Sequence, residues 1–147
     1  MPIQRLIYHS ASRLPSGEEG MRALRRILEV SNARNGALGI TGVLYHDGVG
    51  FTQVLEGSRA AVAAVFDDIA EDPRHAHVTV LAAAAHPQRD FAGWSMALVT
   101  EADMRQLAEY AQRVPGFDGG RMSGFVPAMM TVLAWRREDV GPKQGRP

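Results

Sequence analysis

The sequence contains no cysteine. This absence excludes disulfides, thiolate metal sites and cysteine nucleophiles. The N-terminal stretch MPIQRLIYHS lacks a basic region followed by a long apolar run, so no secretory signal is visible. No apolar run approaches the roughly 18 residues that a membrane span needs. We therefore expect a cytoplasmic protein with no membrane partner.

An excess of charge is also missing, because 16 basic residues balance 16 acidic ones. This balance argues against a nucleic-acid-binding surface. It also leaves little repulsion between copies, so we expect a homo-oligomer. The scattered histidines have no spacing typical of metal ligands, and no metal site is expected. There is no glycine-rich phosphate loop and no nucleophile elbow, so we predict that the protein has no catalytic residues and is not an enzyme.

The stretch GITGVLYHDGVGFTQVLEG, residues 39–57, predicts two strands joined by a turn. The strands are residues 40–46 and 51–56, and the Asp-Gly-Val-Gly sequence between them is typical of a turn. Alternation along the second strand places Gln53 between two large apolar residues, on the face that meets a core. A buried amide without partners costs roughly 1–3 kcal/mol. Gln53 therefore requires a polar partner inside the fold.

The remaining periodic segments complete one domain with a βαββαββ order. The predicted strands are residues 4–10, 77–85 and 94–100, and the predicted helices are residues 17–34, with a capping box at Ser16 and Glu19, and 59–71. The Asn35-Gly36 pair is a natural helix stop. Two helices on one face of a mixed five-stranded sheet make a ferredoxin-like α+β fold. Residues 101–114 and 125–137 predict a helical extension with a break at residues 115–120.

Three regions follow from this pattern. We expect an α+β domain over residues 1–100, a C-terminal helical extension over residues 101–140 and a disordered tail over residues 141–147. The second helix of the extension carries apolar side chains that must be buried against another surface. We expect the extension to pack on the sheet face that the first two helices leave open.

Polar residues gather among the inward positions. Tyr8 has apolar neighbours on the first strand, and Asn35 ends the inward face of the first helix. One interpretation is a core tyrosine bonded to the Gln53 amide, with no further function. The loop Asp72-Pro73-Arg74-His75 can likewise be a helix stop with solvated side chains. The residues alone leave both interpretations open.

Four motifs in order carry a resemblance to a known family: RLIYHS, NARNGALGITGVLYHDGVGFTQVLEG, DPRHAHV and FAGWSMAL. Together they resemble the BLUF domain, which senses blue light with a flavin, over about residues 4–100. The resemblance implies that Tyr8 is the redox-active tyrosine and that Gln53 is the amide that rotates or tautomerises. It implies that Trp94 and Met96 respond to this switch.

The resemblance also implies the flavin-binding residues. They are Tyr8, Ile27, Ser31, Arg34, Asn35, Ile40, Gln53, Asp72, Arg74 and His75. FAD is the expected cofactor. FMN and riboflavin remain alternatives, because Asp68 stands where some members place a basic residue that can meet the phosphate.

The expected function is a blue-light photoreceptor that signals to a partner protein or to its own oligomer, with no output enzyme attached. The resemblance makes residues 1–100 the flavin-binding photosensor domain, and we expect the C-terminal extension to move or loosen in the light. Two alternatives from other classes are a flavin-dependent enzyme and a flavin-free α+β interaction module. The colour of the purified protein separates the module from the other two. A reversible response to light separates the photoreceptor from the enzyme.

Overall fold

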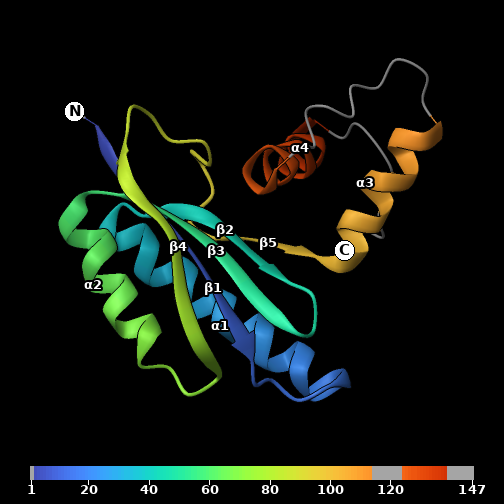
Figure 1. Cartoon of the computed structure of the whole chain (residues 1–147), viewed down its shortest axis with the longest axis horizontal. Helices are drawn as coiled ribbons and strands as arrows, with labels where there is room; N and C mark the ends of the chain where they lie inside the picture. Colours follow the sequence, from blue (N-terminus) through green and yellow to red (C-terminus); the bar gives the residue numbers. More distant parts are fainter. Residues whose placement is uncertain (1, 114–123, 139–147) are drawn as a thin grey trace. The chain divides into compact units, whose positions relative to one another are not determined.

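Residues 2–113 and 124–138 are described by the computed structural model, and they form two compact units that divide between Leu98 and Val99 (Figure 1). Their elements are β1 (Ile3–Ser12), α1 (Gly17–Leu38), β2 (Thr41–His46), β3 (Gly50–Gly57), α2 (Arg59–Ala70), β4 (His75–His86), β5 (Ala97–Thr100), α3 (Glu101–Arg113) and α4 (Phe125–Glu138).

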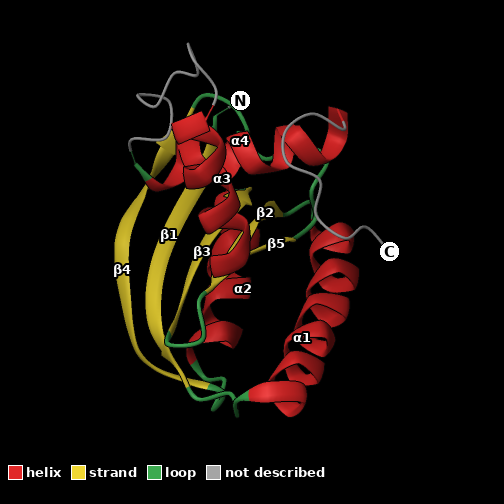
Figure 2. Ribbon diagram, turned by 90° about the vertical axis from the view of Figure 1, so that its right-hand side faces the viewer, coloured by secondary structure: helices red, strands yellow, loops and turns green. Residues whose placement is uncertain are grey.

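The five strands form one sheet in the order β4-β1-β3-β2-β5. β1 pairs antiparallel with both β3 and β4, and β3 pairs antiparallel with β2. Consequently β1 runs parallel to β2, to which α1 connects it, and β3 runs parallel to β4, to which α2 connects it. Figure 2 shows α1 and α2 on the same side of the sheet. The predicted ferredoxin-like α+β fold is confirmed.

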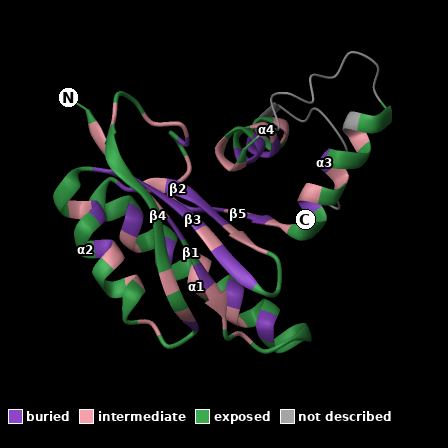
Figure 3. Cartoon of the chain, in the orientation of Figure 1, coloured by how far each residue is buried: buried purple, intermediate pink, exposed green. Residues whose placement is uncertain are grey.

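The core of the first unit lies between the sheet and these two helices. Leu24 of α1 and Val62 and Val65 of α2 pack against Leu6 and Leu55 of the sheet. Burying an aliphatic side chain of this size contributes roughly 1.5–3 kcal/mol relative to leaving it in water. Figure 3 shows that buried positions concentrate on the central strands, whereas β4 is mostly exposed. The core therefore fixes the positions of both helices against the central strands.

Two local signals act as the sequence predicts. Asp47 Oδ1 accepts hydrogen bonds from the amides of Val49 and Gly50, at 2.9 and 2.8 Å, which closes the turn between β2 and β3. Ser58 Oγ accepts from the amide of Ala61 at 3.1 Å and caps α2. Each side chain satisfies backbone donors that the regular elements leave without partners.

Two predicted boundaries and one predicted capping bond were wrong. α1 continues past Asn35-Gly36 to Leu38, because the residue in the left-handed conformation is Gly39, at φ +69°, whose amide donates to the Asn35 carbonyl. Ser16 occupies the N-cap position, but within the described residues its side chain makes no capping bond, so the capping box is absent. β5 begins at Ala97 rather than at Trp94, because the carbonyls of Ser95 and Met96 accept hydrogen bonds from asparagine side chains of α1.

The second unit contains α3 and α4, close to the helices predicted over residues 101–114 and 125–137. Asp103 of α3 pairs with Arg136 of α4 at 2.9 Å, and this ion pair joins the two helices. The same carboxylate accepts a hydrogen bond from the Thr100 amide, just before α3, at 2.7 Å. The rings of Tyr110 and Trp135 meet edge to face at 4.9 Å. The predicted break at residues 115–120 and the predicted tail at 141–147 lie outside the described residues. Over the described ranges, none of the helices is long and apolar enough to cross a membrane.

Candidate functional site

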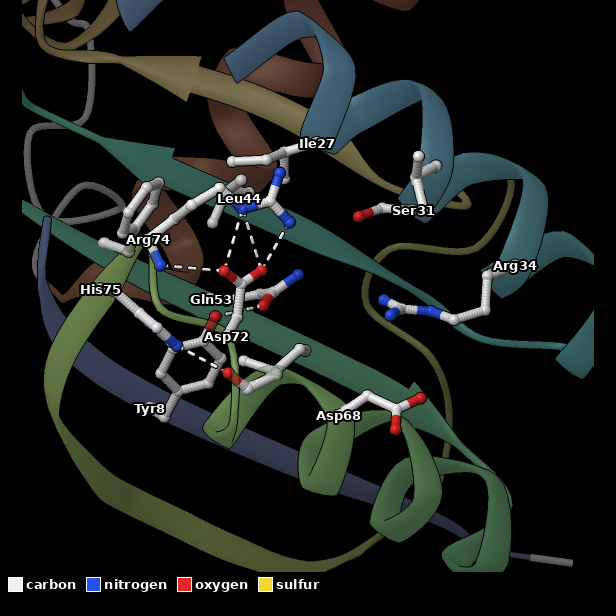
Figure 4. Close-up of a pocket in the computed structure, with 13 residues that line it drawn as sticks. Tyr8, Ile27, Ser31, Arg34, Leu44, Gln53, Asp68, Asp72, Arg74 and His75 are labelled. Atoms are coloured by element: carbon white, nitrogen blue, oxygen red, sulfur yellow. Dashed lines mark hydrogen bonds and ion pairs between the residues drawn. The ribbon is translucent and has the colours of Figure 1, made fainter. Parts of the chain in front are cut away.

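A pocket opens between α1, α2 and the face of the sheet that these helices cover (Figure 4). It contains about 580 Å³ of space, including its open mouth, which falls in the range of small-molecule sites. The sheet, both helices and the loop before β4 contribute to its walls. The lining residues are Tyr8, Ile27, Val30, Ser31, Arg34, Leu44, Phe51, Gln53, Asp68, Ile69, Asp72, Arg74 and His75.

A chain of buried side-chain contacts forms the inner end of this pocket. Tyr8 and Gln53 face each other on β1 and β3, and the Tyr8 hydroxyl donates to Gln53 Oε1 at 2.5 Å. Gln53 Nε2 donates to the sulfur of Met96 at 3.3 Å. The amide oxygen and nitrogen thus have different partners, and these partners favour one orientation of the Gln53 side chain. The polar partner that the sequence requires for Gln53 is Tyr8.

The pKa of Tyr8 is raised well above its ordinary value. Burial in the core is the larger cause, the negative charge of Asp72 adds to it, and the positive charge of Arg34 opposes both. Removing a proton from a buried phenol creates a charge with poor solvation, which is why burial raises the pKa. Tyr8 therefore keeps its proton and remains a hydrogen-bond donor at neutral pH.

His75 supports the pocket from the side of β4. Its Nε2 lies 2.7 Å from the Ile69 carbonyl, and its Nδ1 lies 2.7 Å from Ser10 Oγ. A carbonyl oxygen only accepts, so Nε2 carries a proton, and in the neutral ring Nδ1 accepts from the serine hydroxyl. The imidazole lies edge-on to Tyr8 and to Phe51, with ring centroids 6.1 Å apart in both pairs. These contacts fix the ring next to the phenol.

Two asparagines on α1 hold the segment that precedes β5. Asn35, which is fully buried, donates through Nδ2 to the Ser95 carbonyl at 3.0 Å. Asn32, one turn earlier, donates to the Met96 carbonyl at 3.2 Å. Residues three apart on a helix share a face, so the pair contacts two consecutive carbonyls. The position of Met96 beside Gln53 is thereby tied to α1.

Charged residues surround the mouth of the pocket. The Arg74 guanidinium donates to both carboxylate oxygens of Asp72, from Nε to Oδ1 at 2.9 Å and from Nη2 to Oδ2 at 2.5 Å. These bonds hold the pKa of Asp72 below its usual range, although partial burial opposes the shift. Figure 4 shows Arg34 on α1 and Asp68 on α2 at the end of the pocket away from Tyr8. The mouth thus presents two acidic and two basic side chains, which balance in charge.

The structure brings together most of the residues that the family resemblance selects. Asn35 and Ile40 are buried outside the described lining, and Met96 is buried while Trp94 is half-buried. The other eight predicted flavin-binding residues line the pocket. They are Tyr8, Ile27, Ser31, Arg34, Gln53, Asp72, Arg74 and His75.

Five lining residues were missing from the predicted set: Val30, Leu44, Phe51, Asp68 and Ile69. A signal existed for two of them. Phe51 shares the inward face of β3 with Gln53, and Ile69 belongs to the buried stripe of α2. Which inward residues border a cavity rather than the packed core is a property of the assembled layers, and periodicity does not report it.

The chemistry of the lining fits a flavin. A flavin has a flat, largely apolar ring with polar edges, and the pocket offers the aliphatic side chains of Ile27 and Ile69 on opposite helices. Its inner end offers the amide and hydroxyl of Gln53 and Tyr8, while Arg34 and Arg74 at the mouth match an anionic tail. Small-molecule sites generally combine apolar walls with a few placed polar groups in this way.

Comparison with known sequences supports this chemistry. The BLUF family model, described as sensors of blue-light using FAD, matches residues 3–97. The chain is 32% identical over 93 residues to the blue light- and temperature-regulated antirepressor BluF of Escherichia coli K12, covering 63% of this chain and 22% of that protein. It is 33% identical over 94 residues to the photoactivated adenylate cyclase subunit beta of Euglena gracilis, covering 64% and 11%. This chain therefore spans less than a quarter of the length of these relatives.

Solved structures agree with the sequence matches. The dark-state structure of BlrB, a BLUF protein, superposes with a TM-score of 0.72 at 31% identity, covering 92% of this chain and 97% of that one. The ground-state structure of BlsA gives a TM-score of 0.68 at 25% identity, covering 96% and 91%. The match to the family model extends over most of the chain and includes the pocket. This chain belongs to the BLUF family of blue-light sensors that bind a flavin.

Proposed function

We propose that this protein is a blue-light photoreceptor that holds FAD in the pocket between α1 and α2 and converts light absorption into new hydrogen bonds at Gln53. The observation that carries the proposal is the buried chain from Tyr8 through Gln53 to Met96, in which Tyr8 and Gln53 line the pocket. FAD is favoured over FMN and riboflavin because the description of the matching family model names it.

A bound flavin would supply the absorption of blue light and the oxidising strength of the excited ring. The residues of the chain would supply the rest. Tyr8, kept protonated by burial, would provide and recover an electron and a proton through its hydroxyl. The Gln53 amide would rotate or tautomerise, which changes the groups to which it donates. Among the described residues, Tyr8 and Met96 are the hydrogen-bond partners of this amide, and Met96 would carry the change to the segment before β5.

The other predicted residues would hold the cofactor. Ile27 and Ile40 would contact the ring, and Asn35 would bind its polar edge. Ser31 and Arg34 of α1, together with Asp72, Arg74 and His75 before and in β4, would surround its rim and side chain. Eight of the ten predicted binding residues border the same pocket, which supports this assignment.

The output of the switch would leave through the segment before β5 into α3, which follows β5 directly in the chain. We assign residues 1–100 as the sensor and residues 101–140 as the output extension, which would act on a partner protein or a second copy. We also propose a non-enzymatic, cytoplasmic protein. The names of the relatives describe an antirepressor and a cyclase subunit, so relatives with this domain have different outputs.

The test of the sensor is spectroscopic. Purified protein should be yellow, with about one non-covalent flavin per chain. Blue light should shift its absorption slightly to the red, and the shift should reverse in the dark. A colourless protein that binds none of FAD, FMN and riboflavin on incubation would contradict the proposal. A bound flavin with no reversible shift would favour a flavin-dependent enzyme.

The test of the output uses a truncated chain. Deletion of residues 121–147 removes α4 and should leave the spectral shift intact, because every contact of Gln53 described here lies in the first unit. The deletion should change oligomer size or partner binding. Identical elution volumes and partner binding for full-length and truncated protein, in darkness and in light, would exclude this segment as the output.

A further inference from the structure

Glu56 is a charged side chain in a fully buried position, with 0% of its surface exposed. It lies on β3 three residues after Gln53, and side chains an odd number of residues apart point to opposite faces of a sheet. The carboxylate therefore does not share the pocket side with Gln53. A buried charge costs a large free energy unless hydrogen bonds satisfy it, so its partners indicate its role.

Three donors satisfy this carboxylate. Oε1 accepts from the Thr41 hydroxyl at 2.9 Å and from the Phe91 amide at 3.0 Å. Oε2 accepts from the Asp90 amide at 2.7 Å. Arg89 adds a positive charge, because its Nη1 donates to Thr41 Oγ1 at 2.8 Å and to the Glu56 carbonyl at 3.1 Å. Hydrogen bonds to an ionised acceptor are roughly twice as strong as neutral ones. Glu56 thus fixes two consecutive amides of the loop between β4 and β5.

That loop leads directly to the contacts of the switch. Phe91 is 1% exposed, and its carbonyl accepts from the Trp94 amide at 3.0 Å, which forms a tight turn. The Trp94 carbonyl accepts from the Gly42 amide of β2 at 2.9 Å. Two residues later, the sulfur of Met96 meets Gln53 Nε2. Only four residues lie between Phe91, whose amide is fixed, and Met96, so a displacement at one end is transmitted to the other.

We propose that Glu56 is a positioning residue of the photoswitch. By fixing the backbone at Asp90 and Phe91, it holds the Met96 sulfur where it favours a single orientation of the Gln53 amide. Glu56 does not touch the pocket and acts through the loop alone. This inference rests on the proposed switching role of Gln53, and it adds a residue on the opposite face of the same strand.

Glu56→Gln is the sharpest variant. Glutamine has nearly the same shape but only one acceptor oxygen, and in either orientation its amino group would face a backbone amide, that of Asp90 or that of Phe91, which can only donate. The loop then has to move away from β3, and Met96 moves with it. Gln53 then loses the sulfur, which only accepts, and the Tyr8 hydroxyl that remains can either donate or accept, so both orientations of the amide become populated in the dark.

The experiment compares wild type with Glu56→Gln, both full-length and loaded with flavin. The first measurement is NMR of the Gln53 side-chain amide, whose signals are assigned by their loss in Gln53→Leu. The second is the light-induced spectral shift. Wild type should give one set of amide signals and Glu56→Gln two. If the two orientations become equally populated, the amplitude of the shift should fall to about half. Flavin affinity should not change. The matched control is Glu29→Gln, which alters an exposed glutamate of α1 and should behave as wild type.

One set of signals and an unchanged shift in folded Glu56→Gln would overturn the proposal. If that variant does not fold, Thr41→Val decides, because it removes one donor to the carboxylate and one acceptor of Arg89 while preserving shape. Thr41→Val should give the two sets of amide signals and the reduced shift expected for Glu56→Gln. Thr41→Ser, which keeps the hydroxyl, should behave as wild type. A wild-type response in Thr41→Val would also overturn the proposal. The NMR comparison is made in the dark, so absence of a light response in wild type would refute the photoreceptor without deciding the role of Glu56.

Discussion

At the inner end of the pocket, Tyr8, Gln53 and Met96 are buried and joined by hydrogen bonds between uncharged groups, whereas at its mouth Asp68 and Arg74 are charged and exposed. Charges in contact with water are screened over about 8 Å at physiological salt. Buried neutral hydrogen bonds depend on geometry and are affected little by salt. The inner end is therefore suited to fixing one arrangement of a switch. The mouth is suited to adjusting the affinity for an anionic tail.

The first prediction breaks the inner end and has the largest effect. Gln53→Leu should abolish the light-induced red shift and retain the flavin, because leucine fills the space without a hydrogen-bonding amide. Tyr8→Phe should also abolish the normal shift, because it keeps the ring but removes the hydroxyl that donates to Gln53. Absorption spectra before and after illumination measure both effects.

The matched control for Gln53→Leu is Gln88→Leu, the same substitution at an exposed loop position. It should leave the spectral shift unchanged. A normal photocycle in Gln53→Leu or Tyr8→Phe would show that the buried chain is only part of the core.

The second prediction concerns the asparagine pair of α1. Asn35→Ala should weaken flavin binding, because an amide lost from a buried site leaves polar groups without partners. A cost of about 1–3 kcal/mol corresponds to roughly 5- to 150-fold in affinity. Asn32→Ala is the control, since its exposed amide contacts the same segment one turn earlier. Flavin titrations in which both variants bind as tightly as wild type would remove Asn35 from the binding site.

The third prediction changes the mouth alone. Asp68→Asn should raise the affinity for FMN, because it removes a negative charge from the lining near an anionic phosphate. An exposed charge interaction of about 0.2–1 kcal/mol corresponds to roughly 1.4- to 5-fold. Riboflavin affinity should not change, and high salt should remove the difference. Asp67→Asn, at the neighbouring exposed position outside the described lining, should have little effect. Equal gains for riboflavin and FMN would show that charge is not the cause.

The fourth prediction is the smallest and concerns pH. The Arg74 hydrogen bond lowers the pKa of Asp72 in the folded protein, so the stabilisation from this pair is fully present above the unfolded-state pKa of about 3.9. It is lost as the pH falls through the lower folded-state pKa. Asp72→Asn should therefore reduce the melting temperature slightly at neutral pH and leave it unchanged in strong acid. Because the pair is partly exposed, its contribution is at most about 1 kcal/mol. A melting-temperature difference that persists in strong acid would contradict this origin.

The hairpin shows what local sequence decides. Alternation placed Gln53 inward, the Asp47 turn closed as predicted, and Ser58 capped α2. These features depend on neighbouring residues, whose geometry follows from backbone conformation and side-chain chemistry. The order of strands and helices followed for the same reason. The ten binding residues came from the family resemblance, and their roles toward a flavin remain proposals.

The tertiary structure decided the features that depend on residues distant in the sequence. α1 passes Asn35 because that side chain finds the Ser95 carbonyl 60 residues later, and Gly39 ends the helix instead. β5 starts at Ala97 because the carbonyls before it bind donors from other elements. The alternation of β3 gave Glu56 the opposite face from Gln53, but only the folded loop supplies the two amides that make its burial possible. Sequence patterns report which face a side chain occupies, whereas hydrogen-bond partners on other elements are fixed only when the layers assemble.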